Sequence, residues 1–410
     1  MSKVVEKFIE YVKIDTEPVP GAGVVPTTEK EFDLARVLVK QLQDMGVPDV
    51  RLDEKHCFVY ATIPSNLPED KKVPAIGFMA HMDTAPDMSG KDVKPRVLCY
   101  EGGDIVLNEE LNIVMKISET PELPTYIGKH LIVTDGTTLL GADDKAGIAE
   151  IMEMAEYFMT NPEVPHGTIK IAFTPDEEGG GGIHYFDIEA FGADGAYTVD
   201  GGILGGMDYE CFNAAGAELT ITGYAIHPGS AKGRMLNAAL IGMEFNSLLP
   251  VEQIPAYTEG AEGFFHLSSF TGNVDQAVLD YAIRDHDRTK FEQKKALFLA
   301  CAEFLNTKYG RKVAEVKLTE QYCNMKEMII PEHTHLIDNA NEAMRRLGIT
   351  PINSPIRGGT DGSTLSFRGL PCPNLCTGGH NCHGRFEYAC VEEMESCVEI
   401  LKNIIKIYAE

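Results

Sequence analysis

The sequence is poor in basic residues and has no long apolar run. Its 410 residues carry 36 Lys and Arg against 62 Asp and Glu, which gives a net charge of −26 at pH 7. Binding to nucleic acid or to an anionic membrane depends on clustered Lys and Arg, so neither partner is expected. No apolar stretch approaches the ~20 residues that cross a bilayer, so no membrane span is expected either.

The ten cysteines include no CxxC pair. No secretory signal is expected at the start of the chain, because Met1 to Lys13 carries alternating charges and no uninterrupted apolar core. Reduced thiols in a cytoplasmic protein are therefore predicted, rather than a disulfide framework. A structural zinc site built from Cys376, Cys382 and His383 is an alternative, although its spacing matches no common zinc finger.

In the first half of the chain, short apolar runs alternate with amphipathic segments, which predicts an α/β fold with a mainly parallel sheet. Short apolar runs are typical of strands that are buried on both faces. Thr28 and Glu31 have capping-box spacing, so a helix is expected there, with Gly46 as its stop. The main predicted strands are residues 57–63, 73–79, 131–134, 169–173 and 195–199, and a further helix is predicted at 146–159.

A different pattern begins near residue 210 and has the order β-α-β-β-α-β of a ferredoxin-like module. We therefore predict an inserted α+β lid domain at 210–321 and a catalytic domain at 1–209 and 322–410. Such a module exposes a sheet edge, so a homodimer through the lid is a further expectation. The predicted elements of the module are strand 218–225, helix 231–248, strands 264–271 and 277–284, helix 287–305 and strand 313–318, and later helices follow at 334–346 and 391–407.

Five loops follow apolar runs, and each presents a side chain that can bind a metal ion. In FTPDEEGGGG, two adjacent glutamates stand where a strand ends. Neighbouring strand residues point to opposite faces, so both glutamates reach one site only if the backbone turns, which the glycines permit. The candidates are His81 and Asp83 in AHMD, Asp143 and Asp144 in GADDK, Glu177 and Glu178, Asp200 in TVDGG, and His380 and His383 in GGHNCHG.

Each of these signals has an ordinary structural explanation when it is taken alone. Acidic stretches are often surface loops, aspartates before helices are often caps, and an isolated histidine is usually structural. Together, however, they place histidines and carboxylates at successive strand ends, where the sites of parallel sheets gather. This set suits two zinc or similar divalent ions bridged by a carboxylate and a water, with a further carboxylate as general base.

Seven segments, spread nearly from end to end, resemble the two-zinc exopeptidase family that includes aminoacylase and carboxypeptidase G, and within it the tripeptide aminopeptidases. The resemblance implies a zinc-exopeptidase catalytic domain with an inserted lid, two Zn²⁺ per subunit, a small peptide substrate, and removal of the N-terminal residue of a tripeptide. The segments are GFMAHMD, LLGADDKAGIAEI, FTPDEEGGGG, YTVDGG, GYAIHPGSAKGRMLNA, IRGGTDGSTLSFRGLPCPNL and TGGHNCHG.

The resemblance also implies metal-binding roles for the matching residues. His81 and Asp200 would bind one zinc ion, and Glu178 and His383 would bind the other. Asp143, two residues before Lys145, would bridge the two ions. His380 departs from the family, because a tyrosine is expected at its position.

The remaining implied roles concern catalysis and the substrate. Asp83 would orient His81, and Glu177 would act as the general base. On the lid, His227 in HPG would hydrogen-bond the developing oxyanion, and Arg357 in IRGGTDG would anchor a peptide carboxylate. Their ordinary alternatives are a helix-entry turn for His227 and a surface salt bridge for Arg357.

Two other functions fit the same residues. A dipeptidase or an N-acyl amino-acid deacylase of the same family would keep the chemistry and change the substrate. A zinc-dependent binding or scaffold protein would have no turnover, and a glutamate at position 177 speaks against it.

Overall fold

The structure is a computed structural model that describes residues 2–410. The chain forms two compact units. Unit 1 comprises Met1–Tyr209, Glu327–Ser354 and Thr360–Glu410, and unit 2 comprises Glu210–Lys326 and Pro355–Gly359. The predicted lid boundary at residue 321 lies inside a strand, so unit 2 continues past it and also takes in a second, short segment.

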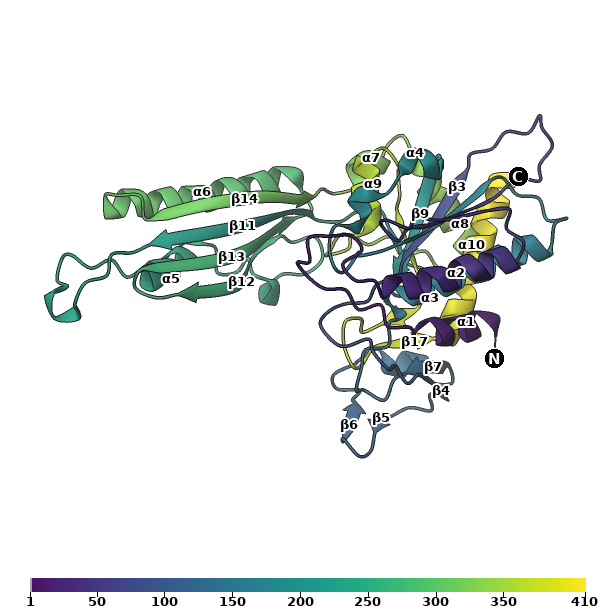
Figure 1. Ribbon diagram of the computed structural model, residues 1–410, viewed down its shortest axis with the longest axis horizontal. Helices are drawn as coiled ribbons and strands as arrows, with labels where there is room; N and C mark the ends of the chain where they lie inside the picture. The colour runs from purple at the N-terminus through teal and green to yellow at the C-terminus, as the bar shows by residue number, and fades with distance from the viewer. Residues whose placement is uncertain (1) are drawn as a thin grey trace. The chain divides into compact units, whose positions relative to one another are not determined.

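A seven-stranded sheet forms the centre of unit 1 (Figure 1). Four adjacent strands, β8, β3, β9 and β15, run parallel, and antiparallel strands complete both edges. β3 is buried along its whole length, as expected for a strand covered on both faces. The order is β1 (Asp49–Leu52), β2 (Val59–Ile63), β8 (Ile169–Thr174), β3 (Ile76–His81), β9 (Gly195–Gly201), β15 (Asn374–Cys376) and β10 (Met207–Asp208).

Helices and apolar loops cover this sheet. The long helix α3 packs on β3 and β9, and α1 and α10 lie against α3. On the other face, Phe186 and Phe191 pack against Met79 of β3. The helices of unit 1 are α1 (Lys3–Tyr11), α2 (Glu31–Asp44), η1 (Leu123–Tyr126), α3 (Ala142–Thr160), η2 (Gly182–Tyr185), α4 (Ile188–Phe191), α7 (Lys326–Ile329), α8 (Thr334–Arg346), α9 (Asp361–Phe367) and α10 (Val391–Ala409).

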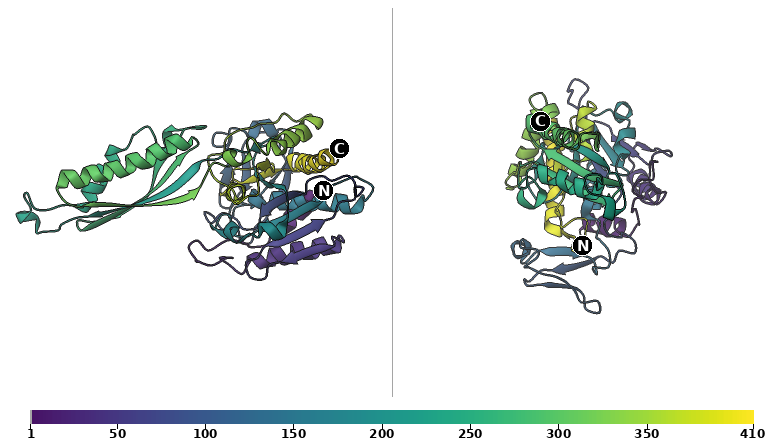
Figure 2. Two further views of the ribbon diagram at one scale, coloured as in Figure 1. Left: turned by 90° about the horizontal axis from the view of Figure 1, so that it is seen from above. Right: turned by 90° about the vertical axis from the view of Figure 1, so that its left-hand side faces the viewer.

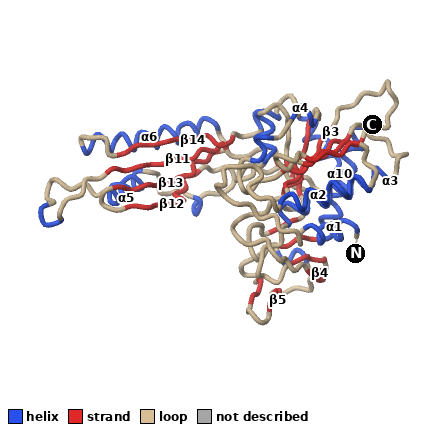
Figure 3. The backbone as a smooth tube through the Cα atoms, viewed as in Figure 1, coloured by secondary structure: helices blue, strands red, loops and turns tan. Residues whose placement is uncertain are grey.

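Unit 1 also contains two smaller antiparallel sheets. The first has the order β16 (Gly379–His380), β17 (Tyr388–Cys390), β7 (His130–Val133) and β4 (Arg96–Cys99). The second is a hairpin of β5 (Ile105–Asn108) and β6 (Ile113–Met115). Figure 3 shows that loops connect many of these short elements.

Unit 2 has the predicted order β-α-β-β-α-β, and its four strands form one antiparallel sheet (Figure 2). Alternate apolar residues such as Leu219, Leu279 and Ile283 face Phe245 of α5 and Phe298 of α6 in one core. The elements are β11 (Asn213–Thr222), η3 (Pro228–Ser230), α5 (Ala238–Leu248), η4 (Pro255–Tyr257), β12 (Phe264–Gly272), β13 (Gln276–Asp285), α6 (Arg288–Tyr309) and β14 (Ala314–Tyr322), and the sheet order is β12-β13-β11-β14. The prediction of an α/β fold with an inserted ferredoxin-like module is confirmed.

Two helix starts differ from the sequence predictions. The helix expected from residue 231 begins at Ala238, because the Asn237 side chain accepts the Leu240 N–H at 3.3 Å and caps the helix there. No capping box forms at α2, since the side chain of Glu31 instead accepts the backbone N–H of Asp176 at 3.2 Å. A local cap therefore decides the start of α5, and a tertiary contact replaces the capping box expected at α2.

Across residues 2–410, none of the helices combines the length and the apolar character that a membrane crossing requires.

Candidate active site

The parallel strands of unit 1 end at one edge of the sheet, and this edge carries the predicted site residues. His81 is the last residue of β3, and Glu177 and Glu178 follow the end of β8. Asp200 lies near the end of β9, and His383 follows β15 on a loop. The carboxyl ends of parallel strands meet on one side of a sheet, which is why these distant segments come together.

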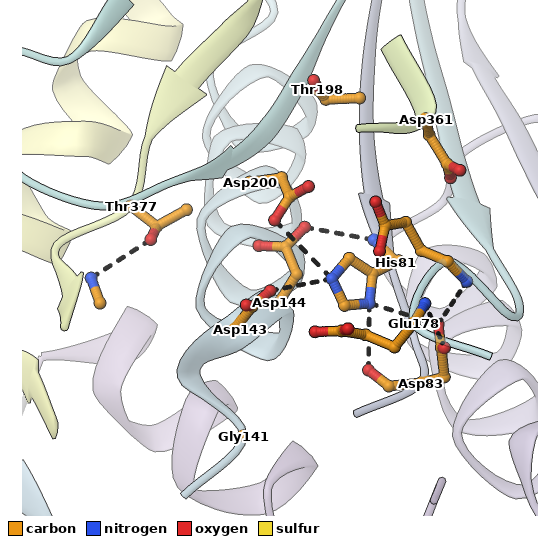
Figure 4. Close-up of polar contacts among 12 residues, drawn as sticks. His81, Asp83, Gly141, Asp143, Asp144, Glu178, Thr198, Asp200, Asp361 and Thr377 are labelled. Carbon is orange, nitrogen blue, oxygen red and sulfur yellow. Dashed lines mark hydrogen bonds and ion pairs between the residues drawn. The ribbon is translucent and has the colours of Figure 1, made fainter. Parts of the chain in front are cut away.

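Asp143 lies between the two histidines. Its Oδ1 is 2.9 Å from Nε2 of His81, and its Oδ2 is 3.2 Å from Nε2 of His383. Nε2 of His383 is also 2.7 Å from Oε1 of Glu178, and Nε2 of His81 is 3.7 Å from Oδ1 of Asp200. The Nε2 atoms of the two imidazoles therefore share the Asp143 carboxylate, and each Nε2 atom also faces a second carboxylate, as Figure 4 shows for His81.

The backbone at the start of α3 leaves the helical conformation, and this places the Asp143 side chain at the site. Asp143 has φ −84° and ψ 104°, and Asp144 has φ −120° and ψ 30°. Gly141 precedes them with φ +81°, a left-handed angle that favours glycine. The side chains of these aspartates have other partners than the ordinary alternative of a helix cap implies: Asp143 faces the two histidines, and Oδ2 of Asp144 accepts the His81 N–H.

Asp83 holds both His81 and the loop after β8. Its Oδ1 lies 3.3 Å from Nδ1 of His81 and accepts the Glu177 N–H at 3.0 Å. Its Oδ2 accepts the N–H groups of Glu178 at 2.9 Å and Gly179 at 3.1 Å. The side chain is fully buried, so these contacts fix the ring nitrogen that faces away from the ligand cluster.

The charges of the cluster shift the pKa values of its members. Hydrogen bonds to Asp143 and Glu178 raise the pKa of His383 to about 11. Burial opposes protonation of His81, but hydrogen bonds to Asp143 and Asp83 outweigh it and raise its pKa well above the ordinary value. Burial raises the pKa of Glu177 and that of Asp200. The neighbouring carboxylates thus stabilise the protonated, positively charged form of both imidazoles. Bound cations would supply positive charge at the same place.

Three groups of side chains have ligand atoms that all lie within 4.8 Å of one another. They are His81 with Glu177 and Glu178, His81 with Asp144 and Asp200, and Asp143 with Glu178 and His383. Imidazole nitrogens and carboxylate oxygens are suitable ligands for zinc and similar divalent ions, so the residues present fit a two-metal site. None of these groups contains a cysteine, and among residues 2–410 the alternative set of Cys376, Cys382 and His383 forms no such group.

His380 lies outside the cluster. Its Nε2 is 2.9 Å from the Tyr126 hydroxyl and 2.9 Å from Oε2 of Glu393, and its ring stacks on Tyr388. Of the two histidines in GGHNCHG, His383 is therefore the one that faces Asp143 and Glu178.

The two predicted lid residues belong to unit 2, and each has defined partners there. Nδ1 of the exposed His227 accepts the Gly229 N–H at 3.1 Å, so the hydrogen of the neutral ring is on Nε2. The Arg357 guanidinium donates to the carbonyls of Gly260 at 2.8 Å and Glu262 at 3.0 Å, and to the hydroxyl of Thr258 at 2.8 Å. Within the described part of the chain, residues 2–410, Arg357 has no salt bridge, contrary to its ordinary alternative.

Three buried carboxyl groups near these residues received no role from the family resemblance, and the sequence analysis named only Asp144 among them as a candidate. Oδ2 of Asp144 accepts the His81 N–H at 3.2 Å, and Oδ2 of Asp361 accepts the Thr174 hydroxyl at 2.7 Å. Glu387 accepts backbone N–H groups at the start of α3. In the sequence, Asp144 is one of two adjacent aspartates and Asp361 lies within GGTDG, whereas no local pattern marks Glu387.

Comparisons with known proteins identify the family to which this chain belongs. The model of peptidase family M20/M25/M40 matches residues 134–407. A protein from Alkaliphilus oremlandii called peptidase T is 53% identical over 411 residues, and one of the same name from Halothermothrix orenii is 54% identical over 410 residues. Both alignments cover 100% of this chain and 100% of the relative. The chain belongs to the M20/M25/M40 peptidase family.

Solved structures of the family share the fold of this chain. Aminopeptidase PepT from Bacillus cereus superposes with a TM-score of 0.78 at 25% identity, covering 100% of this chain and 98% of the other. A dinuclear metal-binding peptidase of the M20 family from Bacillus subtilis superposes with a TM-score of 0.66 at 14% identity, covering 99% and 98%. The second similarity concerns the fold alone. The family assignment agrees with the resemblance inferred from the seven sequence segments.

Proposed function

We propose that this M20 peptidase is a two-metal aminopeptidase that removes the N-terminal residue of tripeptides. The observation that carries the proposal is the position of Asp143, whose two oxygens each face the Nε2 atom of a different histidine. The full-length similarity to proteins called peptidase T supports the peptide substrate.

The contacts among these side chains support one assignment of ligands to the two ions. His81 and Asp200 would hold one ion, Glu178 and His383 the other, and Asp143 would contact both. Zinc suits these nitrogen and oxygen ligands. Bound divalent ions would supply a water of lowered pKa and would polarise the carbonyl oxygen of the substrate.

Glu177 is the proposed general base. Burial raises its pKa, so its carboxylate is a stronger base than one in water. Glu177 would take a proton from the attacking water while the water oxygen bonds to the carbonyl carbon. It would then give this proton to the amine nitrogen as the peptide C–N bond breaks, which yields a free amino acid and a dipeptide.

His227 and Arg357 are the proposed substrate contacts of the lid. The neutral His227 ring can donate from Nε2 to the oxygen that becomes negatively charged, because Nδ1 already accepts a backbone N–H. An arginine has five N–H donors, and three of those of Arg357 hold the loop around Gly260 and Glu262. Two donors are left on a guanidinium whose orientation is already fixed, which suits a peptide carboxylate.

A panel of substrates of different length tests the proposal. Metal-loaded protein should release alanine and dialanine from Ala-Ala-Ala, and it should hydrolyse Ala-Ala and N-acetyl-alanine much more slowly. Preferred cleavage of Ala-Ala would indicate a dipeptidase, and preferred cleavage of N-acetyl-alanine would indicate a deacylase. Failure to cleave any tripeptide would refute the proposal. Metal analysis of the same preparation reports the number and identity of the ions.

A separate test distinguishes the general base from the metal ligand among the two adjacent glutamates, because both lie within ligand reach of His81. Glu177→Gln should keep both ions and lose about 10²- to 10⁴-fold in kcat, the usual contribution of a general base. Glu178→Gln, the matched variant, should instead weaken metal binding. If Glu177→Gln loses an ion and Glu178→Gln keeps both, the two roles are exchanged. The cytoplasmic location and the homodimer stay predictions.

A further inference from the structure

Glu387 is a buried carboxylate that no role in the proposed mechanism uses. It lies on the loop between β16 and β17, and only 1% of its surface is exposed. Its Oε2 accepts the N–H groups of Leu140 and Gly141, both at 2.7 Å. Its Oε1 accepts the N–H of Asp143 at 3.1 Å. One side chain thus binds three backbone donors in the segment that leads into α3.

These donors need an acceptor from elsewhere in the chain. The first N–H groups of a helix have no partner within the helix, and a buried one is costly to leave unpaired. A negative charge is also favourable at a helix N-terminus. The backbone at Asp143 is not helical, so regular helix hydrogen bonds do not fix its direction. Glu387 supplies that restraint from outside the helix.

The same side chain connects two parts of the candidate metal site. Glu387 lies four positions after His383 on one loop, and it holds the backbone of Asp143 on another segment. The His383 ring faces Oδ2 of Asp143 at 3.2 Å, and Oδ1 of Asp143 faces His81 at 2.9 Å. A change at Glu387 can therefore alter the spacing between Asp143 and both imidazoles.

We infer that Glu387 is a positioning residue that holds Asp143 in the orientation needed to contact both metal ions. This inference rests on the proposed function only in taking Asp143 as a ligand of both ions. Glu387 itself touches neither the substrate nor the ions. Its effect passes through the backbone N–H of Asp143 and through the loop that carries His383.

Glu387→Gln is a sharp test because it retains the shape of the side chain. The amide oxygen can still accept from Leu140 and Gly141, but the NH₂ group then faces the N–H of Asp143, so that contact is lost. We expect about 10- to 100-fold weaker binding of at least one ion, the usual cost of disturbing a group that orients a metal ligand. KM should change little relative to kcat. The binding measurement uses Co²⁺ titrated against a chelator, which also gives the absorption spectrum of the bound ions.

Two further variants separate positioning from folding. Glu393→Gln is the matched control, since Glu393 is also buried on the C-terminal part of the chain but contacts His380 rather than a ligand. Glu387→Asp keeps the charge, and it should recover part of the cobalt affinity. If both glutamine variants lower the unfolding free energy equally and neither changes Co²⁺ affinity or spectrum, Glu387 only stabilises the fold and the inference is wrong.

The cobalt measurement also separates this inference from the proposed function. If wild-type protein binds two Co²⁺ ions but cleaves no tripeptide, the proposed substrate is wrong and the comparison of affinities still tests Glu387. If the wild-type protein cleaves tripeptides while Glu387→Gln binds cobalt as tightly, only the role of Glu387 is refuted.

Discussion

Replacing Asp83 by asparagine should damage the metal site and the loop of the proposed base together. The carboxylate serves four donors: Oδ1 faces His81 and the Glu177 N–H, and Oδ2 faces the N–H groups of Glu178 and Gly179. In Asp83→Asn one oxygen becomes an NH₂ group. If it replaces Oδ2, the N–H groups of Glu178 and Gly179 lose their acceptor. If it replaces Oδ1, the Glu177 N–H loses its acceptor, whereas Nδ1 of His81 still faces the Asp83 backbone carbonyl at 3.0 Å. At about 1.5 kcal/mol for each hydrogen bond to a charged group, the unfolding free energy of the metal-free protein should fall by about 1.5 to 3 kcal/mol, depending on which oxygen is replaced.

The metal site should lose affinity as well, because Asp83 orients the His81 ring from its Nδ1 side. We expect zinc affinity and kcat to fall by about 10- to 100-fold. Urea unfolding of the metal-free protein gives the first quantity. Chelator competition with zinc and initial rates on Ala-Ala-Ala give the others.

Asp53 provides a matched control within the same chain. Its Oδ1 accepts the N–H groups of Lys55 at 2.8 Å and His56 at 3.2 Å, and its Oδ2 is 3.1 Å from Nδ1 of His56. Asp53→Asn therefore breaks the same kinds of contact without touching a metal ligand, and it should lower stability alone. Equal zinc affinity and equal kcat in Asp83→Asn and Asp53→Asn would refute the reasoning and leave Asp83 with a purely structural role.

Two further predictions concern substrate recognition and pH. Arg357→Lys should raise KM for Ala-Ala-Ala by about 10-fold or more, since lysine lacks the planar donor fork, and it should leave KM for the tripeptide amide unchanged; equal effects on both substrates would mean that Arg357 only holds its loop. Burial raises the pKa of Asp208 to about 6, so the native state binds its proton more tightly than the unfolded chain does. This bound proton contributes up to about 3 kcal/mol to the free energy of unfolding. The contribution is fully present below about pH 4 and is lost as the pH rises through 6. Asp208→Asn should remove this part of the decline in urea unfolding between pH 4 and 7, and an unchanged pH profile would contradict the assignment.

The sequence was sufficient to predict the elements whose signals are local. An apolar run that ends in a polar residue marks both the strand and the position of its last side chain, as for His81 after β3 and Asp200 in β9. Because parallel strands end at one edge, these local signals also implied that the residues meet. The β-α-β-β-α-β order of unit 2 followed from the same kind of pattern.

Features that depend on partners distant in the chain could not be predicted in this way. The Thr28 and Glu31 pattern suggested a capping box, but the Glu31 carboxyl group contacts Asp176, on a loop far along the chain. Thr27 joins the same contact, since its N–H and hydroxyl donate to Asp176 at 2.7 and 2.5 Å. The start of α5 was misplaced because an apolar pattern shows where a helix can exist and a cap decides where it begins.

The donors around each carboxylate distinguish the proposed metal ligands from the groups that are proposed to orient them. Glu387 accepts three backbone N–H groups, and Asp83 accepts three more besides facing Nδ1 of His81. These N–H groups do not release a proton, so they hold both side chains in place. Asp143 and Glu178 instead face imidazole nitrogens, which can release a proton and bind an ion in its place. The surroundings of each carboxylate, rather than its residue type, therefore separate the proposed metal ligands from the proposed positioning groups.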